Sequence, residues 1–174
     1  NYARPLLAAV PEENQRRHEL LDLIAAFEWF EPIDPELLCK SVRVNALGAL
    51  QCVDVFLPML DRGREKRLCF ISSEVSSVAL MQRDGDFRYC MSKTALNIAV
   101  RMLHNTLYPR GYSFRLYQPG WMRRQNPDGS LLTRDARQID PAFSAARAMP
   151  LFTGTRPDEE RLELVDYLGS IWPF

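Results

Sequence analysis

Helical and strand patterns alternate along this chain, and the alternation limits the fold more than any other feature. A short β-prone run without helical periodicity occupies residues 67–73 (RLCFISS), and a second occupies residues 112–121 (YSFRLYQPGW) and ends in a Pro-Gly turn. Helical spacing fills the interval from Tyr89 to Leu107. A last strand is predicted within residues 164–169 (LVDYLG). The alternation predicts an α/β layered domain with a mainly parallel sheet.

Two helices are predicted before the first strand. The weaker pattern covers residues 12–27, and the stronger covers residues 32–60. Asp34 can cap the stronger helix, and Pro35 suits its first position. Pro58 is expected to bend the last turn or to shorten it.

The part of the chain after the second strand is less regular. Residues 122–140 are polar and predict a loop, whereas residues 141–152 (PAFSAARAMPLF) predict a short helix. Residues 155–163 are rich in charge, and the acidic run at 158–160 is expected to form a solvated face. No repeat or linker divides the chain, so one domain over residues 1–174 is expected.

Composition argues against several classes of function. Lys plus Arg and Asp plus Glu both number 22 without a basic stripe, which argues against nucleic acid as a partner. No apolar run is expected to reach the roughly 20 residues that span a bilayer, and no secretory signal is recognised, so a cytoplasmic protein without a membrane partner is expected. Two histidines and four scattered cysteines suggest no metal site.

Tyr89 and Lys93 are four residues apart at the start of a predicted helix, so both side chains lie on one helix face. Free tyrosine has a pKa of about 10, and a neighbouring ammonium favours the phenolate. The pair is therefore a candidate acid–base device. The alternative is an exposed lysine beside a half-buried tyrosine, because this spacing also arises by chance.

Other polar residues fall where an α/β sheet builds its sites. Ser72 and Ser73 follow the first predicted strand, at the edge of the sheet where the carboxyl ends of parallel strands meet. The Pro119-Gly120 turn follows the second strand. Asn45 is a polar residue within an apolar helical run and therefore needs a partner.

In their order and spacing, these elements resemble the short-chain dehydrogenase/reductase family over nearly the whole chain. The matching stretches are the Asn45–Gly48 element, the serine loop RLCFISSEVSS, the helix start YCMSKTALN and the turn YQPGW. The likeness is greatest to the carbonyl-reductase-like branch. It implies a Rossmann-like, three-layer α/β/α fold with a mainly parallel sheet.

The resemblance implies a role for each residue of the set. Tyr89 would be the general acid or base, and Lys93 would lower its pKa and bind the nicotinamide ribose. Ser73, preferred over Ser72 because it matches the second serine of the family's pair, would hydrogen-bond the substrate oxygen. Asn45 would hold a water in a proton relay to Lys93.

The implied cofactor is NAD or NADP, and the sequence does not distinguish them. Pro119, Gly120 and Met122 would lie near the nicotinamide, together with Tyr89 and Lys93. The family's N-terminal glycine-rich turn is missing, since no two of the eight glycines fall within four residues of each other. The chain is therefore expected to lack the N-terminal strands of the nucleotide-binding sheet.

Two functions follow from this combination. The first is NAD(P)-dependent reduction of a small carbonyl compound or oxidation of an alcohol, in a chain that is inactive without the nucleotide-binding half. The second is a catalytically inactive binding or scaffold protein of the same fold. In either case a homo-oligomer is expected, because the family often dimerises through the helices that carry Asn45 and Tyr89.

Overall fold

The structure, a computed structural model, describes residues 33–174, and its elements belong to one unit, Asp34–Phe174. The helix predicted over residues 12–27 lies outside the described residues. In chain order the elements are α3 (Pro35–Val42), η1 (Arg43–Leu47), α4 (Gly48–Asp61), β1 (Arg67–Ile71), η2 (Glu74–Ser76), η3 (Val78–Leu80), α5 (Phe87–Leu107), η4 (Tyr108–Arg110), β2 (Ser113–Gln118), β3 (Arg124–Gln125), β4 (Leu131–Leu132), α6 (Pro141–Thr153), β5 (Leu164–Asp166) and β6 (Ile171–Trp172).

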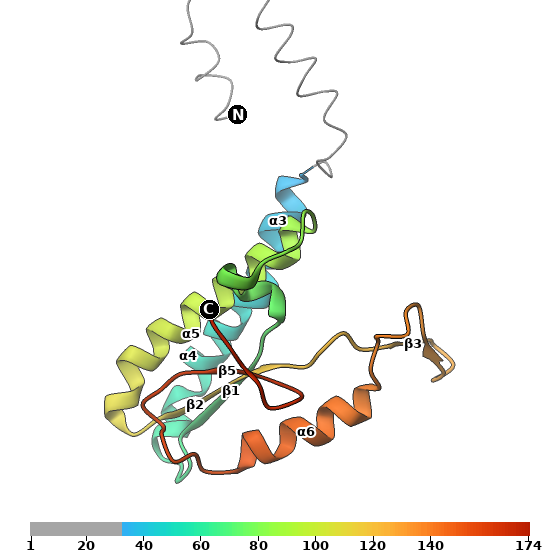
Figure 1. Cartoon of the computed structure of the whole chain (residues 1–174). Coiled ribbons are helices and arrows are strands. Elements are labelled where there is room, and N and C mark those ends of the chain that lie inside the picture. Colours follow the sequence, from blue (N-terminus) through green and yellow to red (C-terminus); the bar gives the residue numbers. More distant parts are fainter. Residues whose placement is uncertain (1–32) are drawn as a thin grey trace, which may run out of the picture. The chain divides into compact units, whose positions relative to one another are not determined.

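The main sheet has the strand order β1-β2-β5-β6. The first three strands are parallel, with Phe70 opposite Leu116 and Leu116 opposite Leu164, and β6 is antiparallel to β5. Helices α4 and α5 cover one side of this sheet and α6 lies on the other (Figure 1). The predicted α/β fold with three layers and a mainly parallel sheet is confirmed.

Strand β2 explains how both faces of the sheet are covered. Phe114 and Leu116 join the apolar core formed with α4 and α5. The alternate residues Arg115 and Tyr117 face α6, where the Tyr117 hydroxyl donates to the Ser144 carbonyl at 2.8 Å. Because each face has its own partner layer, the residues of β2 after Ser113 are all buried.

Residues 35–61 form one long helix, because α3, the π-helical segment η1 and α4 follow each other directly. Asp34 caps it as predicted, since its side chain accepts from the backbone N–H groups of Glu36 and Leu37. Pro58 does not shorten the helix, because the helix continues to Asp61, and the alternative that it bends the last turn stays a prediction. Proline removes one backbone donor, and its fixed φ still suits a helix.

The same helix corrects the sequence argument about membranes. Pro35–Asp61 has 27 residues and a mean hydropathy of 1.3 over its most apolar window, with 11% of that window buried, so by length and composition it could cross a bilayer. The core helix of a soluble protein passes the same test when it is mostly buried, whereas this helix is mostly exposed within the chain. Ala46 and Val53 of this helix belong to the apolar core that also contains Phe70 and Leu116 of the sheet, so the helix is part of the α/β domain.

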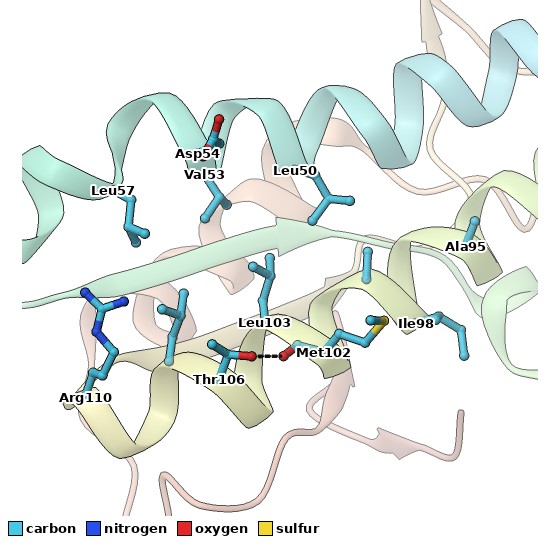
Figure 2. A pocket seen from close by; sticks show the side chains of 12 residues that line it. Leu50, Val53, Asp54, Leu57, Ala95, Ile98, Met102, Leu103, Thr106 and Arg110 are labelled. Carbon is cyan, nitrogen blue, oxygen red and sulfur yellow. Dashed lines mark hydrogen bonds between the residues drawn. The ribbon is translucent and has the colours of Figure 1, made fainter.

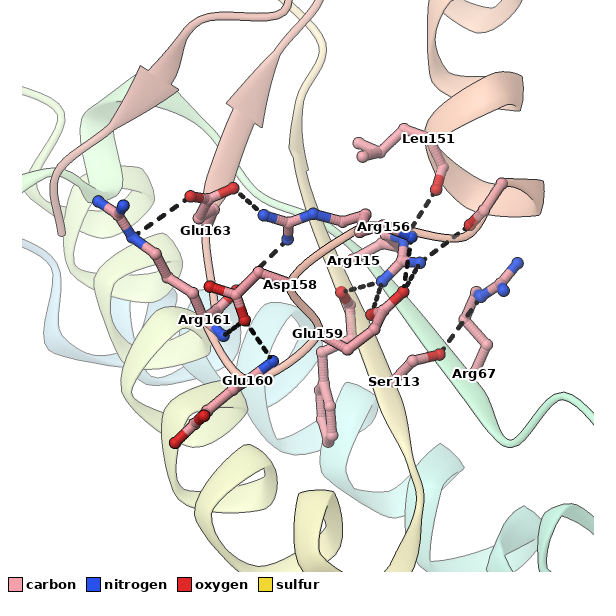
Figure 3. A network of polar contacts seen from close by, with 12 residues as sticks. Arg67, Ser113, Arg115, Leu151, Arg156, Asp158, Glu159, Glu160, Arg161 and Glu163 are labelled. Carbon is pink, nitrogen blue, oxygen red and sulfur yellow. Dashed lines mark hydrogen bonds and ion pairs between the residues drawn. The ribbon is translucent and has the colours of Figure 1, made fainter.

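The charged segment after α6 is held against the sheet by an arginine (Figure 3). The Arg115 side chain is fully buried and donates to both carboxylate oxygens of Glu159 at 2.6 Å. It also donates to the carbonyls of Leu151 and Gly154, each at 2.9 Å. The prediction of a solvated acidic face was therefore wrong for Glu159, because its partner lies far away in the sequence.

Two further expectations for the C-terminal part have clear outcomes. The helix predicted over residues 141–152 is confirmed as α6, with the Asp140 side chain capping its first turn. The loop predicted over residues 122–140 contains a small antiparallel ladder, in which β3 pairs with β4. With two residues in each strand, this ladder is too short to leave a periodic pattern in the sequence.

Candidate active site

The candidate site lies at the carboxyl ends of β1 and β2. Ser73 follows β1 by two residues, and the Pro119-Gly120 turn follows β2 directly. Tyr89 and Lys93 lie in the first two turns of α5. The fold thus brings the sequence-predicted serine loop, Tyr89 helix and Pro-Gly turn to one edge of the sheet, where α/β proteins bind their ligands.

A buried polar network supports the serine loop from below. The Ser72 hydroxyl donates to Asn97 Oδ1 at 2.6 Å, and Asn97 Nδ2 donates to the Ser76 hydroxyl at 2.8 Å. Ser76 in turn donates to the Ser73 carbonyl at 2.5 Å. Ser72 is thus committed to the support, whereas the Ser73 hydroxyl lies beside Tyr89, with which it shares a hydrogen bond.

The electrostatic balance at Tyr89 differs from the one that the resemblance implies. Burial raises the pKa of Tyr89; the hydrogen bond with Ser73 lowers it, and the charge of Glu74 raises it further, so the net direction is upward. Burial also lowers the pKa of Lys93. The Lys93 Nζ lies 5.9 Å from the centre of the Tyr89 ring and donates to the Ile71 carbonyl at 3.0 Å. Within the described residues, Tyr89 is therefore held in its neutral, acid form.

Asn45 lies in η1, the π-helical segment between α3 and α4, and is connected to the Tyr89 helix. Its Nδ2 donates to the Ser92 hydroxyl at 2.9 Å, which donates to the Tyr89 carbonyl at 2.8 Å. A π-helical turn redirects side chains and is frequent at functional sites. The structure thus links Asn45 to the backbone of Tyr89, while its relay to Lys93 stays a prediction.

The Pro119-Gly120 turn needs glycine for two reasons. Gly120 has a φ of +80°, a conformation that side-chain-bearing residues rarely adopt. A Cβ at this position would also lie 2.7 Å from the Tyr167 ring and 2.8 Å from the Ile139 side chain. Met122 lies two residues further on, is exposed, and pairs with Ile139 through an isolated bridge.

Sequence reasoning missed Glu74, Arg83 and Gln118 at this site. Glu74 accepts hydrogen bonds from Ser73, Arg83 and Gln118 and so lies at the centre of the serine loop. Its position directly after the candidate serine was a signal that the sequence offered. Gln118 is the polar last residue of an apolar strand, which is a weaker signal of the same kind.

No protein-family model matches the sequence. The chain is 31% identical over 145 residues to C-signal of Myxococcus xanthus, a match that covers 82% of this chain and 81% of C-signal. It is also 29% identical over 109 residues to the short-chain dehydrogenase/reductase AacuF of Aspergillus aculeatus, over 58% of this chain and 41% of AacuF.

The fold has solved counterparts. An NADPH-bound carbonyl reductase from chicken fatty liver superposes with a TM-score of 0.67 at 20% identity, over 82% of this chain and 59% of that chain. The chain therefore spans most of C-signal but about two fifths to three fifths of the other two proteins. With the serine loop, the tyrosine helix and the Pro-Gly turn in their places on this fold, the chain belongs to the short-chain dehydrogenase/reductase family.

Proposed function

We propose that this chain carries the proton-transfer part of an oxidoreductase site, which reduces a small carbonyl compound or oxidises an alcohol with NAD or NADP. Tyr89 is the acid that protonates the carbonyl oxygen, or the base in the reverse direction. Ser73 hydrogen-bonds the same oxygen, and Lys93 provides a positive charge beside Tyr89. Asn45 holds the Tyr89 helix in register and supplies the polar end of a proton relay.

The observation that carries this proposal is the meeting of Ser73 and Tyr89 at the carboxyl edge of the sheet. The two residues come from different elements, and Ser73 lies close enough to Tyr89 to lower the pKa of its phenol, which is half-buried. Burial keeps the Tyr89 phenol protonated, so it carries the proton that a general acid donates, although its raised pKa lies further from the pH at which general acids work best. Lys93, one turn further along the helix, retains donors on its ammonium beyond the bond to Ile71.

The described residues fit one end of a nicotinamide dinucleotide. Tyr89, Lys93 and the turn at Pro119, Gly120 and Met122 would hold the nicotinamide and its ribose, since the serine loop beside Tyr89 is joined to this turn through Glu74 and Gln118. When bound, the nicotinamide supplies or accepts the hydride. Residues 33–174 provide no glycine-rich turn for the pyrophosphate, so that seat has to come from another part of the protein.

The direct test is dinucleotide-dependent reduction of a panel of carbonyl compounds by the full-length protein, followed through NADPH and NADH absorbance. Tyr89→Phe is expected to lower kcat by about 100-fold or more, because it removes the proton donor. Tyr108→Phe is the matched control at the far end of the helical region and should retain activity. A wild-type protein that neither turns over nor binds either dinucleotide would contradict the proposal.

A non-catalytic binding protein is the second candidate. Two observations favour it: the described residues lack a glycine-rich turn for the pyrophosphate, and the raised pKa of Tyr89 opposes formation of a phenolate. The set of Asn45, Ser73, Tyr89 and Lys93 favours the enzyme, since a scaffold has no chemical need for it. Dinucleotide binding without turnover by the full-length protein would support the scaffold.

We also propose that the protein self-associates through α4 and α5. A groove of about 550 Å³ runs between these helices and is lined mainly by apolar side chains (Figure 2). Met102 and Ile98 of α5 are about two thirds exposed. Apolar faces of this kind are usually covered by a partner, and a second copy supplies the same surface through two-fold symmetry.

A further inference from the structure

Glu74, which follows Ser73 directly, has a carboxylate engaged by three parts of the fold. Oε2 accepts from the Ser73 hydroxyl at 2.7 Å and from Gln118 Nε2 at 3.1 Å. Oε1 accepts from Arg83 Nη2 at 2.9 Å. A carboxylate with both oxygens occupied in this way has little freedom to rotate.

Gln118 extends the contact to the Pro-Gly turn. Its side chain is buried at the last position of β2, and its Oε1 accepts from the Gly120 backbone N–H at 3.0 Å. The continuous series of hydrogen bonds therefore runs from Ser73 through Glu74 and Gln118 to Gly120. It joins the loop after β1 to the turn after β2, the two segments that bracket the candidate site.

We propose that Glu74 is a positioning residue of this site, whose charged carboxylate orients the Ser73 hydroxyl beside Tyr89 and ties it to the Pro119-Gly120 turn. The reactive roles of Ser73 and Tyr89 rest on the proposed function. The hydrogen-bond geometry does not depend on that function and can be tested separately.

The orientation of the serine has a chemical consequence. A hydroxyl has one proton to donate, and Ser73 donates it to Glu74. The Ser73 proton therefore points to Glu74, and a hydrogen bond from Ser73 to the Tyr89 oxygen, the kind that lowers the Tyr89 pKa, requires that this bond be given up. In this state the serine accepts a hydrogen bond from a hydroxyl group, whereas donation to a carbonyl oxygen requires that the bond to Glu74 be given up.

The charges around Glu74 determine its ionisation. Burial raises its pKa, but hydrogen bonds from Ser73, Gln118 and its own backbone N–H, with the nearby charge of Arg83, outweigh burial. The net direction is downward, so Glu74 is ionised at neutral pH.

The charge of Glu74 and the charges of other neighbouring residues shift the pKa of Tyr89. The charges of Glu74 and Asp86 raise the pKa of Tyr89, and that of Arg83 lowers it, on top of the larger effect of burial. The Cys90 thiol, whose pKa is raised by burial, the Lys93 ammonium and the Arg88 guanidinium are further titratable groups at this end of α5. Removal of the negative charge at position 74 should therefore lower the pKa of Tyr89, and removal of the positive charge at position 83 should raise it.

The experiment is titration of Tyr89 by NMR with ¹³Cζ-labelled tyrosine, with the resonance assigned through Tyr89→Phe. Glu74→Gln is expected to lower the Tyr89 pKa by about half a unit or more, and Arg83→Gln to raise it. Glu74→Asp keeps the charge and should stay near the wild-type value. Asp84→Asn, which removes an acid from the same loop, is the matched control and should leave Tyr89 unchanged.

Each outcome bears on the proposal. Shifts of opposite sign for Glu74→Gln and Arg83→Gln support it, and an unchanged Tyr89 pKa in Glu74→Gln overturns it. Should Glu74→Gln fail to fold, the exposed Arg83→Gln variant gives the same decision, since an unchanged pKa there also overturns it. An inactive wild-type protein would defeat the proposed function, yet the titration would still decide the role of Glu74.

Activity of the full-length protein gives a further readout. If the wild type is active, Glu74→Gln should move the limb of the pH–rate profile that reports Tyr89 to lower pH. A variant that loses kcat without any movement of this limb would assign Glu74 a merely structural role.

Discussion

At the scale of single residues, alanine substitutions at two glycines can distinguish the cost of backbone strain from the cost of a steric clash. Gly120 has both, and Gly111 has the strain alone. Gly120→Ala is expected to destabilise the protein by about 2–4 kcal/mol, because the left-handed backbone costs roughly 1–2 kcal/mol and overpacking adds a similar amount. Gly111 is the matched control, since it has a φ of +84° but no atom within 4 Å of the point where a Cβ would lie. Gly111→Ala should therefore cost only the backbone contribution.

The measurement is the free energy of unfolding in urea for both variants. The difference between them reports the contact of the new methyl group with Tyr167 and Ile139. If Gly120→Ala and Gly111→Ala lose the same stability, the side chains of Tyr167 and Ile139 move aside at no cost and do not pack tightly against the turn.

At the scale of elements, the segment between α6 and β5 depends on the pair formed by Arg115 and Glu159. Glu159→Gln is expected to cost about 2–3 kcal/mol at neutral pH, because it leaves a buried guanidinium without its charge partner. Arg137→Gln removes the partner of an exposed pair with Asp135 and should cost much less, because solvent screens that pair.

The pH dependence of this effect has a definite sign. The hydrogen bonds from Arg115 lower the pKa of Glu159 despite partial burial. Its contribution to stability is therefore full above the pKa of an unfolded glutamate and is lost as the pH falls through the lower, folded value. Urea titrations from neutral to acid pH should show the gap between wild type and Glu159→Gln closing. A gap that stays constant would argue against the ion pair.

Local patterns predicted the elements well where their signals are local. The strand at β1, the long helix with its Asp34 cap, and α6 follow from periodicity and capping residues. The segment of Glu159 was misread because its partner Arg115 is 44 residues away, and no local pattern reports that distance. An arginine inside an apolar strand was nevertheless a sign that a buried partner was needed.

In the candidate site, too, some features follow from local sequence and others depend on residues that only the fold brings together. The pairing of Tyr89 with Lys93 follows from helical spacing, and the approach of Ser73 follows from the rule that sites lie at strand carboxyl ends. The direction of the Tyr89 pKa could not be predicted, because it depends on burial and on the charge of Glu74, which only the folded chain brings near.

At the scale of the whole molecule, a dimer interface on the apolar face of α4 and α5 would explain why the helix of residues 35–61 is apolar although it is mostly exposed in a single chain. Residues 35–61 have only 11% of their most apolar window buried within this chain. Two copies that pack these faces together would cover the groove of Figure 2 and remove Met102 from water. The hydrophobic effect then stabilises the pair in proportion to the area covered.

Met102→Glu is therefore expected to convert a dimer into a monomer, since a charge would be buried at the interface without a partner. Light scattering coupled to size-exclusion chromatography gives the mass directly. Met149→Glu is the matched control, because Met149 is similarly exposed, at 57% against 65%, but lies on α6. It should leave the dimer intact. A wild-type monomer at every concentration would contradict the interface, and binding of that monomer to phosphatidylcholine vesicles, abolished by Met102→Glu, would assign the same face to a membrane instead.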